Sequence, residues 1–477
     1  MNRLFVFNRA TMVSPLARAL LLCIALLAPL TACDSGASHG PYQGMESHRA
    51  DADRLIDAAL QDSSAYQRLA LLTDRFGPRF GGTDNLEMAL DWILIEMERD
   101  GLENVRAEPV MIPKWVRGAE SLQLLAPRAQ SMAMLGLGGS VGTPPQGIRG
   151  EVLVVSSFDE LESRTDEAVG KIVLFDAPFT TYGETVQYRG RGAVAAAQAG
   201  AIASLIRSVT PYSMNTPHTG GMSYQEGVRR IPHAAITVED AEMLHRMQDR
   251  GERIEVLLKM EARSEGMVES RNVMGEIVGS EFPEEVIVLG GHIDSWDVGQ
   301  GAMDDGGGSV AAWEAVRLML ENGMRPRRTV RVVLWTAEET GIWGGRAYLE
   351  AHRAEVDNHI LAIESDGGVF KPSGFGFTGS DEAYSIVRSI GEFLDPIEAG
   401  EIARGGGGAD IGPLMGEGVP GMGLNVDGTR YFWYHHTNAD TMDKLDPEEM
   451  ARCVAAMAVI AYVVADLPEP LPRGPSR

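Results

Sequence analysis

The feature that most constrains this sequence is a series of short apolar runs in its second half, each separated from the next by a stretch with helical periodicity. This alternation begins at about Glu269. It is typical of a largely parallel sheet that is covered by helices on both faces. Strands are expected at 285–290, 329–336, 360–364 and 421–426, and helices at 310–321, 344–352, 383–393 and 447–465. The sequence therefore predicts an α/β fold with a mostly parallel central sheet.

Histidine or acidic residues follow each of these expected strands. In open α/β sheets, ligands bind outside the carboxyl ends of the strands, so side chains far apart in the sequence are expected to converge on one crevice. The candidates are His292 and Asp294, Glu338 and Glu339, Asp366, and His435 and His436. This pattern predicts a metal or catalytic site at the carboxyl edge of the sheet.

The spacing of these residues suggests a division of labour. Because alternate residues of an extended segment point the same way, Asp294 can accept the proton on the second imidazole nitrogen of His292 and fix its tautomer. A glycine-rich turn before the helix at 310–321 contains Asp304 and Asp305, of which one can bridge two cations while the other caps the helix. In the glutamate pair that follows the next strand, one carboxylate can bind metal while its neighbour serves as a base.

Mixed imidazole and carboxylate ligation favours zinc, although cobalt or manganese fits a similar geometry. Three carboxylates and two neutral imidazoles can balance most of the charge of two divalent ions. We therefore expect two zinc ions per chain, which would activate a water molecule and polarise a carbonyl group.

The first 32 residues have the pattern of a bacterial lipoprotein signal peptide. Three arginines precede an apolar run at 19–30, and the sequence then reads Thr31, Ala32 and Cys33. A basic segment, an apolar segment and small residues in this order are typical of secretion. We expect an exported protein that is lipid-anchored at Cys33 on the periplasmic side of a membrane or at the cell surface, with residues 33–48 as a tether.

The remaining chain divides by its pattern into three segments. Residues 49–114 and 263–477 are expected to form one catalytic domain, and residues 115–262, with their own short strands and a helix, an inserted α/β domain that supplies no metal ligand. The net charge of −25 argues against nucleic acid as a partner and leaves the N-terminal lipid as the membrane contact. The expected partner is a substrate, and a homodimer is left open.

With these residues assembled, the chain resembles the zinc-dependent exopeptidase family that includes bacterial leucyl aminopeptidases, glutamate carboxypeptidase and carboxypeptidase Q. The resemblance is carried by residues 290–305 (GGHIDSWDVGQGAMDD), residues 431–436 (YFWYHH) and the following Thr437 to Thr441. It is strongest toward the carboxypeptidase Q branch and spans nearly all of the chain after the signal. It implies the zinc exopeptidase fold, with residues 115–262 as a protease-associated domain.

The resemblance also implies roles for individual residues. His292 and Asp366 would hold one zinc ion, Glu339 and His436 the other, Asp304 would bridge them, and Glu338 would be the general base. The implied activity is hydrolysis of dipeptides or short peptides. Three alternatives stay open: an aminopeptidase, a glutaminyl cyclase, and a receptor-like module without catalysis.

Overall fold

The computed structural model describes residues 44–473. The helices are η1 (Met45–His48), α1 (Arg49–Gln61), α2 (Ser64–Phe76), α3 (Asp84–Arg99), α4 (Phe158–Ser163), α5 (Thr165–Ala168), α6 (Tyr182–Gln198), α7 (Val238–Asp249), η2 (Ala302–Gly306), α8 (Gly307–Glu321), α9 (Trp343–Ala351), η3 (Arg353–Asn358), α10 (Asp381–Gly391), η4 (Glu392–Ile397), α11 (Gly412–Gly416), η5 (Gly428–Arg430), α12 (Tyr431–Tyr434), η6 (Met442–Lys444) and α13 (Pro447–Asp466). The strands are β1 (Glu103–Val116), β2 (Glu120–Ala126), β3 (Gln130–Met132), β4 (Met134–Gly136), β5 (Ile148–Val155), β6 (Ile172–Phe175), β7 (Ala203–Arg207), β8 (His233–Ile236), β9 (Glu255–Met260), β10 (Arg263–Ile277), β11 (Phe282–His292), β12 (Arg328–Trp335), β13 (His359–Glu364), β14 (Pro372–Thr378), β15 (Glu401–Arg404) and β16 (Gly421–Val426).

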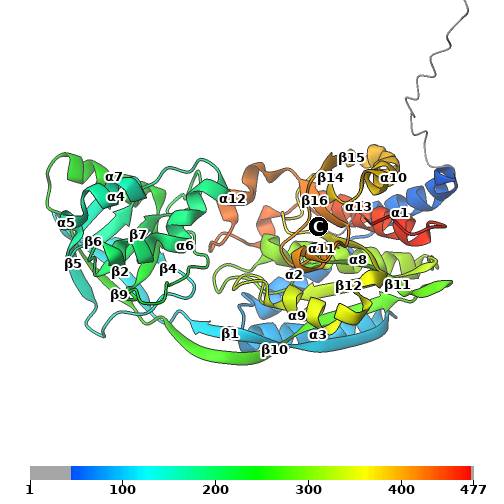
Figure 1. The fold of residues 1–477 in the computed structure, drawn as a ribbon, viewed down its shortest axis with the longest axis horizontal. Coiled ribbons are helices and arrows are strands. Elements are labelled where there is room, and N and C mark those ends of the chain that lie inside the picture. Colours follow the sequence, from blue (N-terminus) through cyan, green and yellow to red (C-terminus); the bar gives the residue numbers. More distant parts are fainter. Residues whose placement is uncertain (1–43, 474–477) are drawn as a thin grey trace, which may run out of the picture. The chain divides into compact units, whose positions relative to one another are not determined.

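The first sheet has eight strands in the order β1-β10-β12-β11-β13-β16-β14-β15 (Figure 1). Its four central strands, β12, β11, β13 and β16, pair in parallel. Strand β10 pairs antiparallel with both β1 and β12, and β14 pairs antiparallel with β16 and parallel with β15. The predicted α/β class with a mostly parallel central sheet is confirmed. Since the four central strands run the same way, their carboxyl ends share one edge of the sheet.

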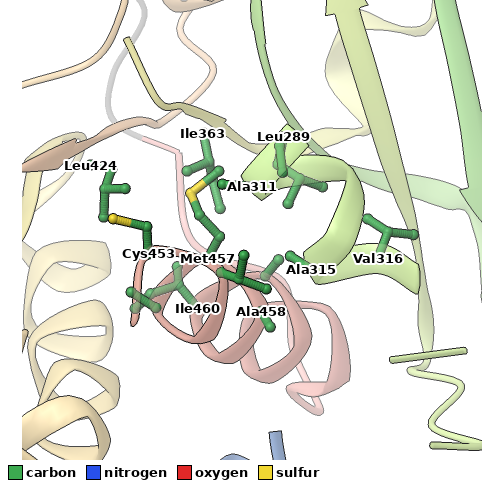
Figure 2. Close-up of a cluster of buried hydrophobic side chains, with 14 of the residues drawn as sticks. Leu289, Ala311, Ala315, Val316, Ile363, Leu424, Cys453, Met457, Ala458 and Ile460 are labelled. Carbon is green, nitrogen blue, oxygen red and sulfur yellow. The ribbon is translucent and has the colours of Figure 1, made fainter. Parts of the chain in front are cut away.

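Helices cover both faces of this sheet, and the alternation of side chains along β11 shows how. Ile287 and Leu289 pack with residues of α8 and α13, whereas Val286 and Val288 pack with residues of α9 and α11 on the opposite face. Figure 2 shows the first of these cores, in which Met457 and Cys453 of α13 lie among residues of α8 and of the strands. Cys453 is fully buried, as expected for a small hydrophobe.

The second sheet contains only strands from residues 120–260, in the order β3-β2-β9-β5-β6-β7-β8-β4. Its strands β5, β6, β7 and β8 pair in parallel, and α6 and α7 pack against it. We call residues 117–262 the insert. The predicted boundary at 114 falls inside β1, which continues to Val116, and β10 begins at Arg263. The assignment of the insert as a protease-associated domain stays a prediction.

The expectations for the N-terminal segment fall mostly outside the described residues. This holds for the signal at 1–32, for the lipid attachment at Cys33, and for the tether up to residue 43. The last tether residues differ from expectation, because they form η1 with Met45 and His48 buried. Within residues 44–473, no helix combines the length and the apolar character needed to cross a membrane.

Candidate active site

The ends of the four central strands bring the predicted site residues together. His292 is the last residue of β11, Glu338 and Glu339 follow β12, Asp366 follows β13, and His436 comes after β16 and α12. Asp304 joins them from η2, the irregular turn that leads into α8. Two groups of metal-ligating atoms result, and both contain Asp304.

The first group consists of His292, Asp304 and Asp366. His292 Nε2 lies 3.2 Å from Asp304 Oδ1 and 3.3 Å from Asp366 Oδ1. The histidine and Asp304 are almost fully buried. These three residues are the ones expected around one metal ion.

The second group consists of Asp304, His435 and His436, and Glu339 lies beside it. His436 Nε2 lies 3.3 Å from Asp304 Oδ2 and 3.1 Å from Glu339 Oε2. His435 is also close, with its Nε2 3.6 Å from Asp304 Oδ2 and its ring stacked on that of His436. Asp304 therefore turns one oxygen to each group, which is the geometry of a bridging ligand.

Asp294 has a different contact from the one expected. The carbonyl oxygen of Asp294, at 3.0 Å, is the nearer partner of His292 Nδ1, while its carboxylate lies 3.6 Å away. The carboxylate instead accepts hydrogen bonds from the backbone N–H groups of Glu338 (3.1 Å) and Glu339 (3.4 Å). Asp294 thus fixes the tautomer of His292 through its backbone and orients the glutamate pair through its side chain.

Asp305 and Asp440 hold the turn that carries Asp304. Asp305 accepts hydrogen bonds from His292 N (3.1 Å) and from Gly308 N (3.0 Å) at the start of α8, so it is the capping member of the Asp304–Asp305 pair. Asp440 accepts from the backbone N–H groups of Ala302, Met303 and Asp304. In the sequence, the only indication of a role for Asp440 is its position shortly after His436.

Arg79 is a supporting residue that sequence reasoning missed. It is fully buried and donates to the carbonyl oxygens of Ile293, Gln300 and Gly301, each at 2.8 Å. Burial lowers its pKa to about 10, although nearby carboxylates oppose this shift. Its guanidinium fixes both ends of the loop between His292 and Asp304. The sequence around it reads as a turn and carries no hint of this role.

The electrostatics of the cluster favour a bound cation. Burial, together with the carboxylates of Asp366 and Asp294, raises the pKa of Glu338 to about 8. Burial and the neighbouring Asp304 raise the pKa of Glu339 well above its ordinary range. Burial also lowers the pKa of His436 strongly, which keeps this imidazole neutral and able to coordinate metal. Burying several carboxylates without an equal number of cations costs folding free energy, which a bound cation would offset.

Two buried carboxylate oxygens without hydrogen-bond partners in the described part of the chain indicate that the residues fit metal ions. Asp304 Oδ2 and Glu339 Oε1 are buried and lack a hydrogen-bond partner among residues 44–473. Buried polar atoms in folded proteins are nearly always satisfied, so these oxygens call for a ligand. With the neutral His436 beside them, they form a donor set suited to zinc.

A cavity of about 430 Å³ opens over both groups. Its lining includes the candidate metal ligands and Glu338, the aromatic residues Tyr431 and Phe432, and three residues of the insert: Tyr182, Arg189 and Gly221. No insert residue belongs to either ligand group. The expectation that the insert shapes the cleft without supplying a metal ligand stays a prediction.

The chain is similar to known peptidases. Residues 272–461 match the family described as Peptidase family M28. Carboxypeptidase Q of Bos taurus is 53% identical over 409 residues, which cover 86% of this chain and 87% of that protein. Carboxypeptidase Q of Homo sapiens is 48% identical over 92% of this chain and 95% of that protein.

Solved structures show the same relationship. The Peptidase M28 precursor from Shewanella amazonensis superposes with a TM-score of 0.86 at 35% identity, covering 90% of this chain and all of that one. BSAP, a zinc aminopeptidase from Bacillus subtilis, shares the fold with a TM-score of 0.64 at 21% identity, over 86% of this chain and 98% of that one. The identity and coverage of the carboxypeptidase Q relatives decide the family. This chain belongs to peptidase family M28.

Proposed function

We propose that this metallo-exopeptidase holds two zinc ions and hydrolyses unblocked dipeptides and short peptides. The observation that carries the proposal is the shared carboxylate of Asp304, which turns one oxygen to His292 and the other to His436. His292 and Asp366 would complete one zinc site, and Glu339 and His436 the other. Bound zinc would supply Lewis acidity, which lowers the pKa of a water molecule and polarises the peptide carbonyl.

The general base in this proposal is Glu338. Its backbone N–H is fixed by Asp294 at 3.1 Å, and its side chain lines the cavity beside both ligand groups. A cation among the surrounding carboxylates would lower the pKa of Glu338, which is raised in their presence alone. The Glu338 carboxylate can then take the proton of the attacking water and deliver it to the leaving amine.

Arg189 supports action at a free carboxyl terminus. This arginine lines the cavity, and its Nε is buried without a hydrogen-bond partner among the described residues. Guanidinium groups bind carboxylates with strong, charge-assisted hydrogen bonds. The relatives named carboxypeptidase Q are consistent with the same direction of attack.

Blocking one peptide terminus at a time tests this assignment. We expect the free dipeptide to be hydrolysed and its C-terminal amide to be cleaved at least about 100-fold more slowly, because the amide leaves a buried cation without its partner. The measurement is kcat/KM for a free dipeptide, its N-acetylated form and its C-amidated form. Efficient cleavage of aminoacyl amides with free dipeptides untouched would instead assign an aminopeptidase.

We further propose export of the protein and lipid attachment at Cys33. The support is the apolar run at 19–30 followed by Thr31, Ala32 and Cys33. Replacing Cys33 with Ser should move the protein from the membrane fraction to the soluble fraction without changing turnover. A variant that stays in the membrane fraction would contradict the attachment. A homodimer stays an open prediction that analytical ultracentrifugation of the purified protein would test.

A further inference from the structure

Two hydrogen bonds made by the Thr219 backbone, one to the backbone and one to the ring of His436, join the insert to this proposed metal ligand. The Thr219 N–H donates to the His436 carbonyl oxygen (3.0 Å), and His436 Nδ1 lies 3.3 Å from the Thr219 carbonyl oxygen. Because His436 Nε2 faces the carboxylates of Asp304 and Glu339, Nδ1 is the nitrogen that must carry the proton when Nε2 binds metal. The Thr219 carbonyl is the available acceptor for that proton, because the other group near this nitrogen, Arg189 Nη1 at 3.4 Å, can only donate. A proton held on Nδ1 by the Thr219 carbonyl leaves Nε2 free for coordination.

The insert also holds the segment just before this ligand. The Thr210 hydroxyl donates to the Phe432 carbonyl (2.5 Å), with the Tyr212 carbonyl at 2.7 Å as a second acceptor. The ring of Tyr182 stacks on that of Phe432, with centroids 5.0 Å apart. Thr210 and Thr219 are both almost fully buried, so water does not replace these contacts.

The backbone of His436 needs such support. Its φ angle is +61°, in the left-handed region that residues other than glycine seldom adopt. Conformations of this kind persist where the surrounding structure enforces them. The bonds from Thr219 are made to both the backbone and the ring of this strained residue.

We propose that Thr210 and Thr219 are positioning residues for His436, so that zinc binding and the docking of the insert on residues 431–437 are coupled. The proposal rests on the proposed zinc site. Reciprocity follows from thermodynamics: if docking strengthens zinc binding, zinc strengthens docking by the same factor. Zinc should therefore stabilise a part of the chain that contributes no ligand.

Hydrogen exchange of the unmodified protein tests the coupling without a substitution. Adding zinc to the metal-free chain should slow exchange in the insert at residues 209–220, while β5, in the same sheet, should change little. Slower exchange confined to residues 286–441 would overturn the proposal. If no zinc bound at all, the proposed zinc site itself would be wrong. If zinc bound without slowing exchange at residues 209–220, only the coupling would be wrong.

A matched pair of variants tests the role of Thr210. Thr210→Val keeps the shape of the side chain and removes the hydroxyl that reaches Phe432. Thr143→Val is the control, because its hydroxyl bonds only to the backbone of Met260 within the second sheet. We expect zinc affinity, measured by chelator competition, to fall about 10-fold in Thr210→Val relative to the control, as with other residues that orient a ligand.

The metal-free Tm separates positioning from general stability. The two variants should melt at similar temperatures without zinc, while the rise in Tm on adding zinc should be smaller for Thr210→Val. Equal zinc affinities for the two variants would overturn the role of Thr210. If Thr210→Val does not fold, the hydrogen-exchange result on the unmodified protein decides.

Discussion

Glu338→Gln is expected to lower kcat by about two to four orders of magnitude while the chain keeps its zinc. The amide keeps the size of the side chain but cannot accept the proton of the attacking water. Neither ligand group includes Glu338, and the Asp294 carboxylate would still fix its backbone N–H. Substrate binding should survive, so KM should change much less than kcat.

The control for this prediction is an exposed glutamate, Glu350, that forms an ion pair with Arg353. Glu350→Gln, on α9, makes the same chemical change at a distance from the cavity and should leave kcat unchanged. Zinc content is measured together with turnover for both variants. Loss of zinc from Glu338→Gln would instead place this residue among the ligands and exchange its role with that of Glu339.

Asp304→Asn is expected to abolish activity by emptying both metal sites. Asp304 is the one residue shared by the two ligand groups, so a neutral amide weakens both sites and removes a charge that offsets the cations. Glu339→Gln is the informative comparison, because Glu339 contacts His436 of the second group and does not belong to the first. We expect about two zinc ions per unmodified chain, about one for Glu339→Gln and none for Asp304→Asn after dialysis.

Zinc retained by the Asp304→Asn variant would contradict a bridging role. If Asp304→Asn retained one zinc ion, the carboxylate would belong to one site only. The fold of the metal-free Asp304→Asn variant is checked by circular dichroism. We expect it to be unchanged, because Asp440 holds this turn through the backbone N–H of residue 304, which the substitution leaves in place.

The central strands and the convergence of site residues on one edge could be predicted from the sequence. The expected strand at 421–426 has the bounds of β16, the one at 329–336 is shifted by one residue from β12, and the one at 360–364 begins one residue after the start of β13. Buried parallel strands are continuous apolar runs, so their ends are sharp in the sequence. Since these ends share one edge, the residues after them meet.

Other features depend on contacts that no local pattern encodes. β10 begins with the exposed, polar residues 263–265, and it forms a strand because it pairs with β1 along most of its length. The carboxylate of Asp294 bonds to the Glu338 and Glu339 backbone, although its spacing from His292 suggested an imidazole partner. Arg79 and Thr219 act through backbone carbonyls, and their role appears only when distant segments are packed together.

Zinc titration of the metal-free chain tests the central claim most directly. Hydrolysis of an unblocked dipeptide is followed as zinc is added in steps to chelator-treated protein. Two sites that share Asp304 predict that activity reaches its plateau at about two zinc equivalents per chain. A plateau at one equivalent, or hydrolysis that does not depend on added metal, would contradict the shared two-metal site.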